Sequence, residues 1–287
     1  MAKKIIKLIL KLSLCTIVYA IVFILASAVL PFSQGFRGLK APDNQWSMLL
    51  LMLNAAWVCF SVYYIIRHSR LKGTKLFLNA LLVVFGVQSF MMQIETIYFA
   101  YAFPALTRLD FFLIMLQGLP PLLAIVPISV KFFQNKNPDA GLPELYGTEH
   151  VKNILIKLGI IGVVYTCVYM TFGYFVAWQF EELRIFYSGL PKKLSFAGQL
   201  ANNMKNDPMI YPFQILRGIL FGAFILPLKF TMANRKTFRI SVCLVYLCTA
   251  MLLIIPNPLF PDAVRIAHLI EMSSSMLLLG IIVGAIL

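Results

Sequence analysis

The sequence predicts an all-α protein, a polytopic transmembrane helical bundle of about eight spans with both termini in the cytoplasm. Charged residues make up only 13% of the chain, against about 25% in a soluble domain. Apolar runs of about 20 residues, enough to cross a hydrocarbon core as helix, recur along the chain. These runs do not alternate polar and apolar residues, which disfavours a transmembrane β-barrel.

Each element follows from one apolar run. The expected spans are residues 8–30, 46–66, 76–104, 110–133, 153–178, 214–230, 239–256 and 264–287. We expect the first span to be a retained anchor, because its apolar run is longer than that of a signal peptide. The expected division is 1–133 for the first four spans, 134–152 for a cytoplasmic connecting loop, and 153–287 for the last four spans with a long outer loop at 179–213.

The orientation is predicted from Lys and Arg, which concentrate in cytoplasmic loops. With the N-terminus inside, four groups of four basic residues, 16 of the 25, fall on the inner side. We therefore expect a multi-pass protein of the plasma (inner) membrane. Of the 11 acidic residues, only Asp139, Glu144 and Glu149 fall inside. This opposite bias indicates a functional feature on the outer side.

The net charge of +14 does not predict nucleic-acid binding, because the basic residues are scattered and suit an anionic bilayer surface. The expected partners are membrane lipids. No CxxC, HxxH or HExxH pair occurs, so we predict neither a disulfide framework nor a metal site. The sequence identifies no cofactor. The five cysteines are all in apolar segments: Cys15, Cys59, Cys167, Cys243 and Cys248.

Polar side chains inside the third and fourth spans need an explanation, since a charge in a span is costly unless it is paired or reaches water. Gln88 and Glu95 are seven residues apart, which predicts one shared helix face. Glu95 is either half of a buried Glu–Arg pair or a site residue. In the fourth span, Pro120, Pro121 and Pro127 free carbonyls near Gln117, which indicates either a kink or a cavity wall.

The sixth span opens with Gln214 and Arg217 on one face. Arg217 is either a site residue or a cation that reaches the headgroups. Gly218 and Gly222 form a GxxxG pattern, which predicts close approach of a neighbouring helix.

The stretch VRIAHLIEMSSSM, residues 264–276, places Arg265, His268 and Glu271 three residues apart at the start of the last span. His68 and His150 fall in predicted loops, so His268 is the single imidazole of the spans. A structural His–Glu contact would explain it, but a site role is the alternative that we favour.

The outer loop holds Glu181, Glu182 and Arg184 at headgroup depth, as site residues or as a solvated loop. Its segment LSFAGQLANNMKND predicts a short interfacial helix capped by Ser195. Leu194, Phe196 and Leu200 of that helix are expected to face lipid. The loop could alternatively dock a protein partner.

The charged groups named above and His268 all fall at the outer ends of their spans, which predicts one outward-facing pocket. They are Glu95, Glu181, Glu182, Arg184, Arg217, Arg265, His268 and Glu271. His268, Glu271 and Glu95 are the candidate catalytic residues, with His268 as base and Glu271 as the group that orients it. An anionic amphiphile, a lipid headgroup or lipid-linked substrate, is the candidate ligand, because the guanidinium group matches phosphate and carboxylate. The candidate substrate-binding residues are Arg217, Arg265, Arg184, Glu181, Glu182, Gln88 and Gln117.

The order of three motifs resembles that of the CAAX-processing and bacteriocin-processing intramembrane proteases, which carry EExxxR, FxxxH and HxxxN. Here the pair Glu181–Glu182 is followed by Phe213-x-x-x-Arg217 and His268-x-x-x-Met272. Phe186 stands in place of the arginine of the first motif. Arg217 and Met272 replace the histidine of the second and the asparagine of the third. The resemblance covers about the last third of the chain.

Four functions therefore stay open from the sequence. The leading hypothesis is a membrane protein that binds and processes or moves an anionic amphiphile. The alternatives are a proton-coupled transporter that uses Glu95, His268 and Glu271, an intramembrane protease distantly similar to the CAAX-processing type, and a non-catalytic membrane subunit.

Overall fold

The computed structural model describes residues 2–40, 45–135 and 150–287, and the elements in these ranges are helices. Eight helical stretches among them are long and apolar enough to cross a membrane, as predicted. Their ends lie within six residues of the predicted ones, and the largest differences are at the start of the first stretch and the end of the third. The stretches are α1 (Ala2–Val29), α3 (Ser47–His68), α4 to α5 (Gly73–Tyr98), α6 to α7 (Arg108–Phe133), α8 to η3 (Val151–Gln179), α11 (Ile210–Thr231), α12 to η4 (Arg235–Ile254) and α13 (Asp262–Ile286).

Several of these stretches consist of more than one element, and short helices join them. The parts of the composite spans are α4 (Gly73–Phe85), η1 (Gly86–Phe90), α5 (Met91–Tyr98), α6 (Arg108–Gln117), α7 (Leu119–Phe133), α8 (Val151–Phe175), η3 (Ala177–Gln179), α12 (Arg235–Met251) and η4 (Leu252–Ile254). The short helices are α2 (Gln34–Gly38), η2 (Ala100–Ala102), α9 (Glu181–Ser188) and α10 (Phe196–Asn206).

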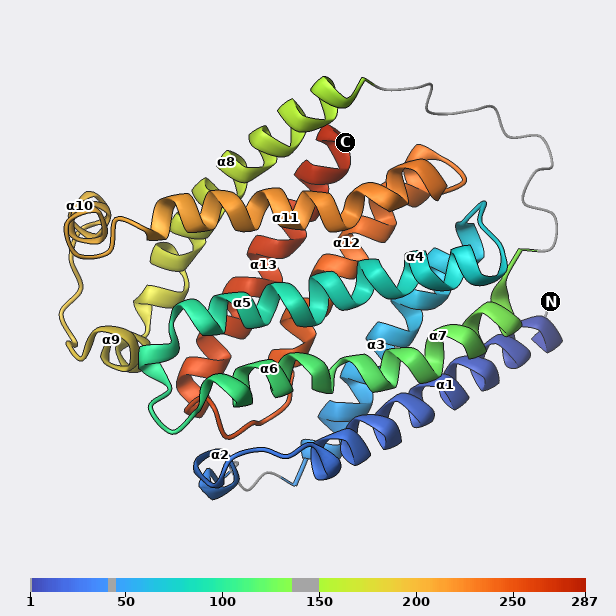
Figure 1. The fold of residues 1–287 in the computed structure, drawn as a ribbon, viewed down its shortest axis with the longest axis horizontal. Helices are drawn as coiled ribbons and strands as arrows, with labels where there is room; N and C mark the ends of the chain where they lie inside the picture. Colours follow the sequence, from blue (N-terminus) through green and yellow to red (C-terminus); the bar gives the residue numbers. More distant parts are fainter. Residues whose placement is uncertain (1, 41–44, 136–149) are drawn as a thin grey trace.

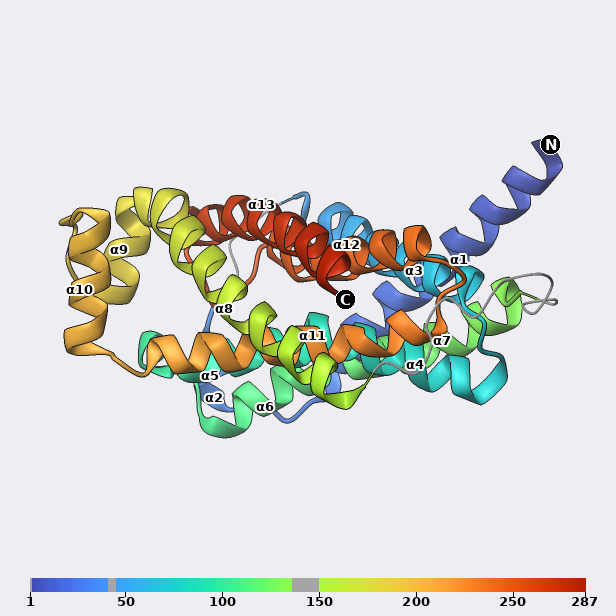
Figure 2. The ribbon, with the colours of Figure 1, turned by 90° about the horizontal axis from the view of Figure 1, so that it is seen from above.

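The long helices pack into one bundle, in which α1, α4 to α5, α6 to α7 and α11 run along the long axis while α3, α8 and α13 run obliquely to it (Figure 1). Seen from above, α13, α12 and α3 form one layer over α11, α4 and α5, while α8 crosses from one layer to the other (Figure 2). The largest helix contacts are those of α12 with α13 and of α8 with α11. One apolar core cluster draws side chains from both halves of the sequence.

The outer surface of the bundle is apolar, as a lipid solvent requires. In an apolar 18-residue window of α1, and likewise in one of the span α8 to η3, only 22% of the residues are buried inside the bundle. Large aliphatic side chains such as Ile9, Leu25 and Leu155 are more than half exposed. The architecture is therefore that of a multi-pass helical membrane protein.

The two ends of the bundle carry different connections (Figure 1). Helices α9 and α10 gather at one end, which the predicted orientation makes the outer end. At the opposite, inner end, the α3–α4 turn is bonded to the α11–α12 turn: Arg70 N donates to Thr231 O at 2.7 Å, and Ala233 N donates to His68 O at 2.8 Å. Residues 136–149 of the predicted connecting loop, with Asp139, Glu144 and Glu149, lie outside the described residues.

A π-helical turn, η1, interrupts the third span and changes its register. The prediction that Gln88 and Glu95 share one face is wrong, because the wider turn inserts a residue into the 3.6-residue period. Gln88 donates to the Tyr19 hydroxyl of α1 at 3.3 Å, whereas Glu95 faces α11.

The fourth span is broken where its prolines predict. Helix α6 ends at Gln117, and α7 begins at Leu119 with Pro120 and Pro121 in its first turn. Proline at these positions needs no backbone donor, so a new helix starts there without loss. The Gln117 amide donates to the Ser27 hydroxyl of α1.

The glycine pair of α11 allows close contact with α8, as predicted. A Cβ atom at Gly218 would lie 2.5 Å from Tyr165 Cβ and 2.7 Å from Gly162 Cα. A Cβ atom at Gly222 would lie 2.8 Å from Leu158 Cδ2. The two helix backbones approach so closely because neither glycine has a side chain at the contact.

Candidate functional site

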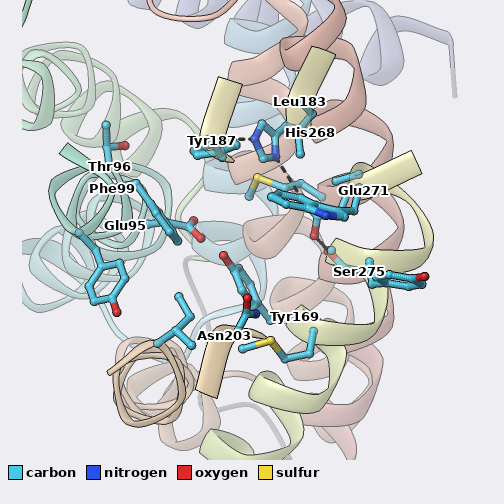
Figure 3. A pocket seen from close by; sticks show the side chains of 18 of the residues that line it. Glu95, Thr96, Phe99, Tyr169, Leu183, Tyr187, Asn203, His268, Glu271 and Ser275 are labelled. Carbon is cyan, nitrogen blue, oxygen red and sulfur yellow. Dashed lines mark hydrogen bonds and ion pairs between the residues drawn. The ribbon is translucent and has the colours of Figure 1, made fainter. Parts of the chain in front are cut away.

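The outer end of the bundle contains a cavity of about 1020 Å³. Its wall is formed by α5, α8, α9, α10 and α13, together with one residue of α6, the start of α11 and the segments around η2, η3 and η4. Aromatic and aliphatic side chains line most of it, and titratable groups project into it from opposite walls (Figure 3). Pockets for drug-sized ligands measure about 300–1,000 Å³, so this cavity has room for a molecule at the large end of that class.

His268 lies in the wall that α13 contributes. Its Nε2 atom is 3.0 Å from the Tyr187 hydroxyl of α9. Its Nδ1 atom is 3.7 Å from Glu271 Oε2, an ion-pair distance when the imidazole is protonated. The other Glu271 oxygen accepts from the Ser275 hydroxyl at 3.2 Å. The result is a chain from a phenol through an imidazole to a carboxylate along one wall (Figure 3).

Tyr187 lies outside the spans, at the outer end. Burial raises the pKa of Tyr187 well above its ordinary value, and the charges of Glu95 and Glu271 add to the effect. Its hydroxyl therefore stays protonated at neutral pH and can donate to the imidazole. With Nε2 as the acceptor, the Nδ1 proton of neutral His268 faces Glu271, so one tautomer suits both partners.

Glu95 lies in the opposite wall, on α5, and is paired with Arg217 of α11. The Arg217 Nη2 atom donates to Glu95 Oε2 at 2.7 Å, and Nη1 donates to Gln214 Oε1 at 2.9 Å. The Arg217 side chain is 1% exposed, and its guanidinium group packs against the rings of Tyr165 and Phe213. Glu95 is thus half of a Glu–Arg pair, one of the two alternatives for it, and the pair joins the third span to the sixth. Glu95 keeps 21% of its side chain exposed.

The cavity brings together the three residues singled out as catalytic candidates. Glu95, His268 and Glu271 all line it. The candidate substrate-binding residues have other surroundings. Arg217, Arg265, Arg184, Glu181, Glu182, Gln88 and Gln117 are not among its lining residues.

Arg265 was expected in the same pocket as His268 and Glu271, but it turns away from the cavity. A step of three residues rotates a helix position by about −60°, so Arg265 is displaced by about 120° from Glu271. Its guanidinium group binds Asp262 Oδ1 at 2.7 Å and the carbonyls of Leu253 and Ile254. Arg265 therefore ties the start of α13 to η4.

Arg184 has a similar structural role in the outer loop. It is buried, and its guanidinium group donates to the carbonyls of Trp178, Gln179 and Pro191. These bonds fold the segment between η3 and α10 back onto α9.

Glu181 and Glu182 form the first turn of α9, and both are exposed. They stabilise the positive end of the helix dipole from that position. The glutamate pair of the protease-like motif order is therefore not gathered around the cavity with His268.

Helix α10 forms as predicted, with the Ser195 hydroxyl accepting from Gly198 N at 3.1 Å. The orientation predicted for it is wrong, since Phe196 and Leu200 line the cavity. Three hydrogen bonds place α10 across the outer end: Tyr174 OH donates to Leu194 O, Tyr211 OH to Leu200 O, and Tyr98 OH to Asp207 Oδ1 at 2.6 Å.

Sequence reasoning missed the polar groups that α10 contributes. Gln199, Asn202, Asn203 and Asn206 line the cavity from this helix. The amides of the run QLANNMKN recur at helical spacing, which predicts a polar helix face. A search for charged residues does not find this face, because its side chains are neutral.

The excess of acidic residues on the predicted outer side is partly explained by structural contacts. Asp110 is fully buried and accepts hydrogen bonds from the backbone and hydroxyl groups of Ser33 and Thr107. Asp262 pairs with Arg265. Among the residues that the structure describes, no group of three His, Cys, Asp or Glu side chains is arranged as metal ligands would be.

Comparisons with known protein families, with curated proteins and with solved structures found no match to this chain. The functional argument therefore depends on the geometry of the cavity.

Proposed function

We propose that this protein binds an amphipathic molecule in the outer cavity and that His268 accepts a proton from the polar part of that molecule. One observation carries the proposal. His268 lies in the wall of a cavity of about 1020 Å³, between the Tyr187 hydroxyl and the Glu271 carboxylate. Polar and titratable groups in an otherwise apolar pocket are typical of binding and catalytic sites.

The imidazole has the partners that a general base needs. A ligand hydroxyl that displaces Tyr187 from Nε2 would find the acceptor lone pair there, and Glu271 would stabilise the imidazolium ion that forms. Glu95 is neutralised by Arg217, so it contributes a hydrogen-bond acceptor to the opposite wall at little cost in charge.

The expected anionic head group is not part of this proposal. Among the described residues that line the cavity, none is Lys or Arg. The three arginines that were expected to clamp an anion are bonded elsewhere: Arg217 to Glu95, Arg265 to Asp262 and Arg184 to backbone carbonyls.

Binding followed by processing is favoured over transport by the packing of the inner half. Fully buried aliphatic side chains, including Val62, Leu76, Val83, Ile125 and Val242, fill the described bundle toward the inner end.

The proposal places the protein in the inner membrane with the cavity on the outer side, on the basis of the basic loops. Docking of a protein partner by loop 179–213 stays a prediction, although α9 and α10 of that loop already serve as cavity walls.

Photoaffinity labelling tests the binding step. An alkyl probe that carries a diazirine is irradiated with the protein in lipid nanodiscs, and the labelled residues are mapped by peptide mass spectrometry. Labelling of Met272 and Met276 on the cavity wall should saturate and be competed by the unmodified chain. Labelling of lipid-facing Ile9 and Leu155 should rise without saturation. Competition at neither cavity residue would contradict the proposal.

The proton-acceptor role is tested with His268→Gln, and His68→Gln at the inner end is the matched control. The mass of the molecule that copurifies from native membranes should differ between wild type and His268→Gln, because the variant retains an unprocessed ligand. His68→Gln should behave as wild type. Identical bound molecules in wild type and His268→Gln would exclude a processing role for His268.

A further inference from the structure

The face of α10 that lines the cavity is built of carboxamides. Gln199, Asn202, Asn203 and Asn206 are spaced i, i+3, i+4 and i+7, so they lie on one side of the helix. Figure 3 shows Asn203 at the same cavity as Tyr169 and Glu95. The 11-residue helix α10 therefore presents four amide groups to the cavity.

The amides are held in position by bonds to each other. Gln199 Nε2 donates to Asn203 Oδ1 at 2.9 Å, and Asn206 Nδ2 donates to Asn202 Oδ1 at 2.8 Å. Each pair leaves one amide oxygen and one amide nitrogen with further capacity, so the face offers both acceptors and donors. Preorganised side chains lose little entropy when they bind a ligand.

A further acceptor lies in the wall that α5 contributes. The Oε1 atom of Gln93 on α5 is buried and has no hydrogen-bond partner among the described residues, and Gln93 lines the cavity. A buried acceptor without a partner costs free energy, and a turn of the Gln93 side chain toward the cavity would bring Oε1 within reach of a donor on the ligand. Asp207 and Glu271 add carboxylate acceptors to the same lining.

Aromatic rings stand among these polar groups. Trp178, Tyr98, Phe99 and Tyr174 all line the cavity. Flat rings cover the C–H faces of a sugar ring, while amides and carboxylates match its hydroxyls, which donate and accept at once. A phosphate or sulfate lacks donors and would meet carboxylates with no described Lys or Arg in the lining.

Resting on the proposed function, we propose that the polar part of the bound amphiphile is an uncharged, hydroxyl-rich group such as a glycosyl unit, and that the carboxamide face of α10 recognises it. A quaternary ammonium group is the competing chemistry, since it would also suit aromatic rings and carboxylates. It would leave the donors of the amide face without a role, which is why the glycosyl group is preferred.

The test uses the full-length protein in phosphatidylcholine nanodiscs, free of sugar-based detergent. Trp46→Phe and Trp57→Phe leave Trp178, which lines the cavity, as the single tryptophan. Octyl glucoside, octyl phosphate and octyl trimethylammonium are titrated below their micelle concentrations, and Trp178 fluorescence is recorded. The glucoside should bind at least about tenfold more tightly than the other two.

Variants of α10 locate the contact. Asn203→Ala should weaken glucoside binding by roughly fivefold, the effect of one hydrogen bond, and should leave the phosphate unchanged. Lys205→Ala, on the same helix but not in the cavity wall, is the matched control and should bind as the parent does. Unchanged glucoside affinity in Asn203→Ala and Gln199→Ala alike would remove α10 from the proposal.

The outcomes separate the two proposals. Tighter binding of the phosphate or the ammonium compound than of the glucoside overturns the head-group inference and leaves the proposed function standing. A saturable response to none of the three amphiphiles overturns the proposed function itself.

Discussion

At the inner end of the bundle, aliphatic side chains such as Val62, Leu76 and Val242 are fully buried, and two turns are hydrogen-bonded to each other. At the outer end, the same helices diverge around a cavity of about 1020 Å³, and polar and aromatic side chains stand among the aliphatic ones. Both ends belong to spans of similar hydropathy. Hydropathy therefore identifies the spans, while the local mixture of aromatic and polar residues distinguishes a packed end from a hollow one.

The outer end also shows two ways of accommodating an arginine. Arg217 is buried at 1% exposure and depends on Glu95, a residue of another helix. Arg265 pairs with Asp262, which is 50% exposed and only three residues away. The first pair joins two helices, whereas the second closes a local turn, and the two should respond very differently to mutation.

The largest effect is expected from Glu95→Gln. This change leaves the Arg217 charge buried without its counter-ion and should cost about 3–5 kcal/mol of unfolding free energy. The double variant Glu95→Gln, Arg217→Gln should cost less than the sum of the single changes. Thermal unfolding in nanodiscs measures both. Additive losses would mean that the pair does not join α5 to α11.

Gly218→Ala is expected to have the next largest effect. The added Cβ atom would meet Tyr165 Cβ at 2.5 Å, so the two helices must separate, at about 1–3 kcal/mol. Gly159→Ala on α8 is the matched control, because its new Cβ atom would have no atom within 4 Å in the described residues apart from its chain neighbours and the adjacent backbone of α8. A loss of stability in Gly159→Ala equal to that in Gly218→Ala would argue against the close contact of α8 with α11.

Alkaline pH should destabilise the outer end through Tyr187. Because burial raises the pKa of Tyr187, the folded protein keeps a proton that the unfolded chain releases above about pH 10. Below that pH, the contribution of Tyr187 to the free energy of unfolding is fully present. Above it, the free energy of unfolding falls by about 1.4 kcal/mol per pH unit, until the folded tyrosine also ionises. The melting temperature should therefore fall less between pH 9 and pH 11 in Tyr187→Phe than in wild type. Equal falls would show that Tyr187 is not the responsible group.

The smallest effect is expected from Asp262→Asn. Its carboxylate is half exposed, and Arg265 keeps its bonds to the carbonyls of Leu253 and Ile254, so the loss of stability should be below about 1 kcal/mol. A cost as large as that of Glu95→Gln would remove the distinction between the two arginines.

The sequence predicts the framework of this protein well. Eight apolar runs, the break at Pro120 and Pro121, the GxxxG contact and the Ser195 cap all follow from local composition or spacing. Each of these features depends on residues that are close together in the sequence, so a single chain segment is enough to predict it.

The direction of individual side chains is harder to predict. The π-helical turn at Gly86–Phe90 separates Gln88 from Glu95, and no residue pattern announces it. Arg265 leaves the cavity because Asp262 and the η4 carbonyls lie nearby, which is a tertiary fact. Phe196 and Leu200 face a cavity where an amphipathic pattern alone predicts lipid.

The central claim is that the outer end is hollow because it holds an amphiphile. An electron cryo-microscopy map of the protein in nanodiscs made from its native membranes tests this most directly. The account predicts elongated density inside the cavity, with its polar end within hydrogen-bonding distance of His268 or the α10 amides. A cavity collapsed by inward movement of α10, or occupied by water alone, would contradict it.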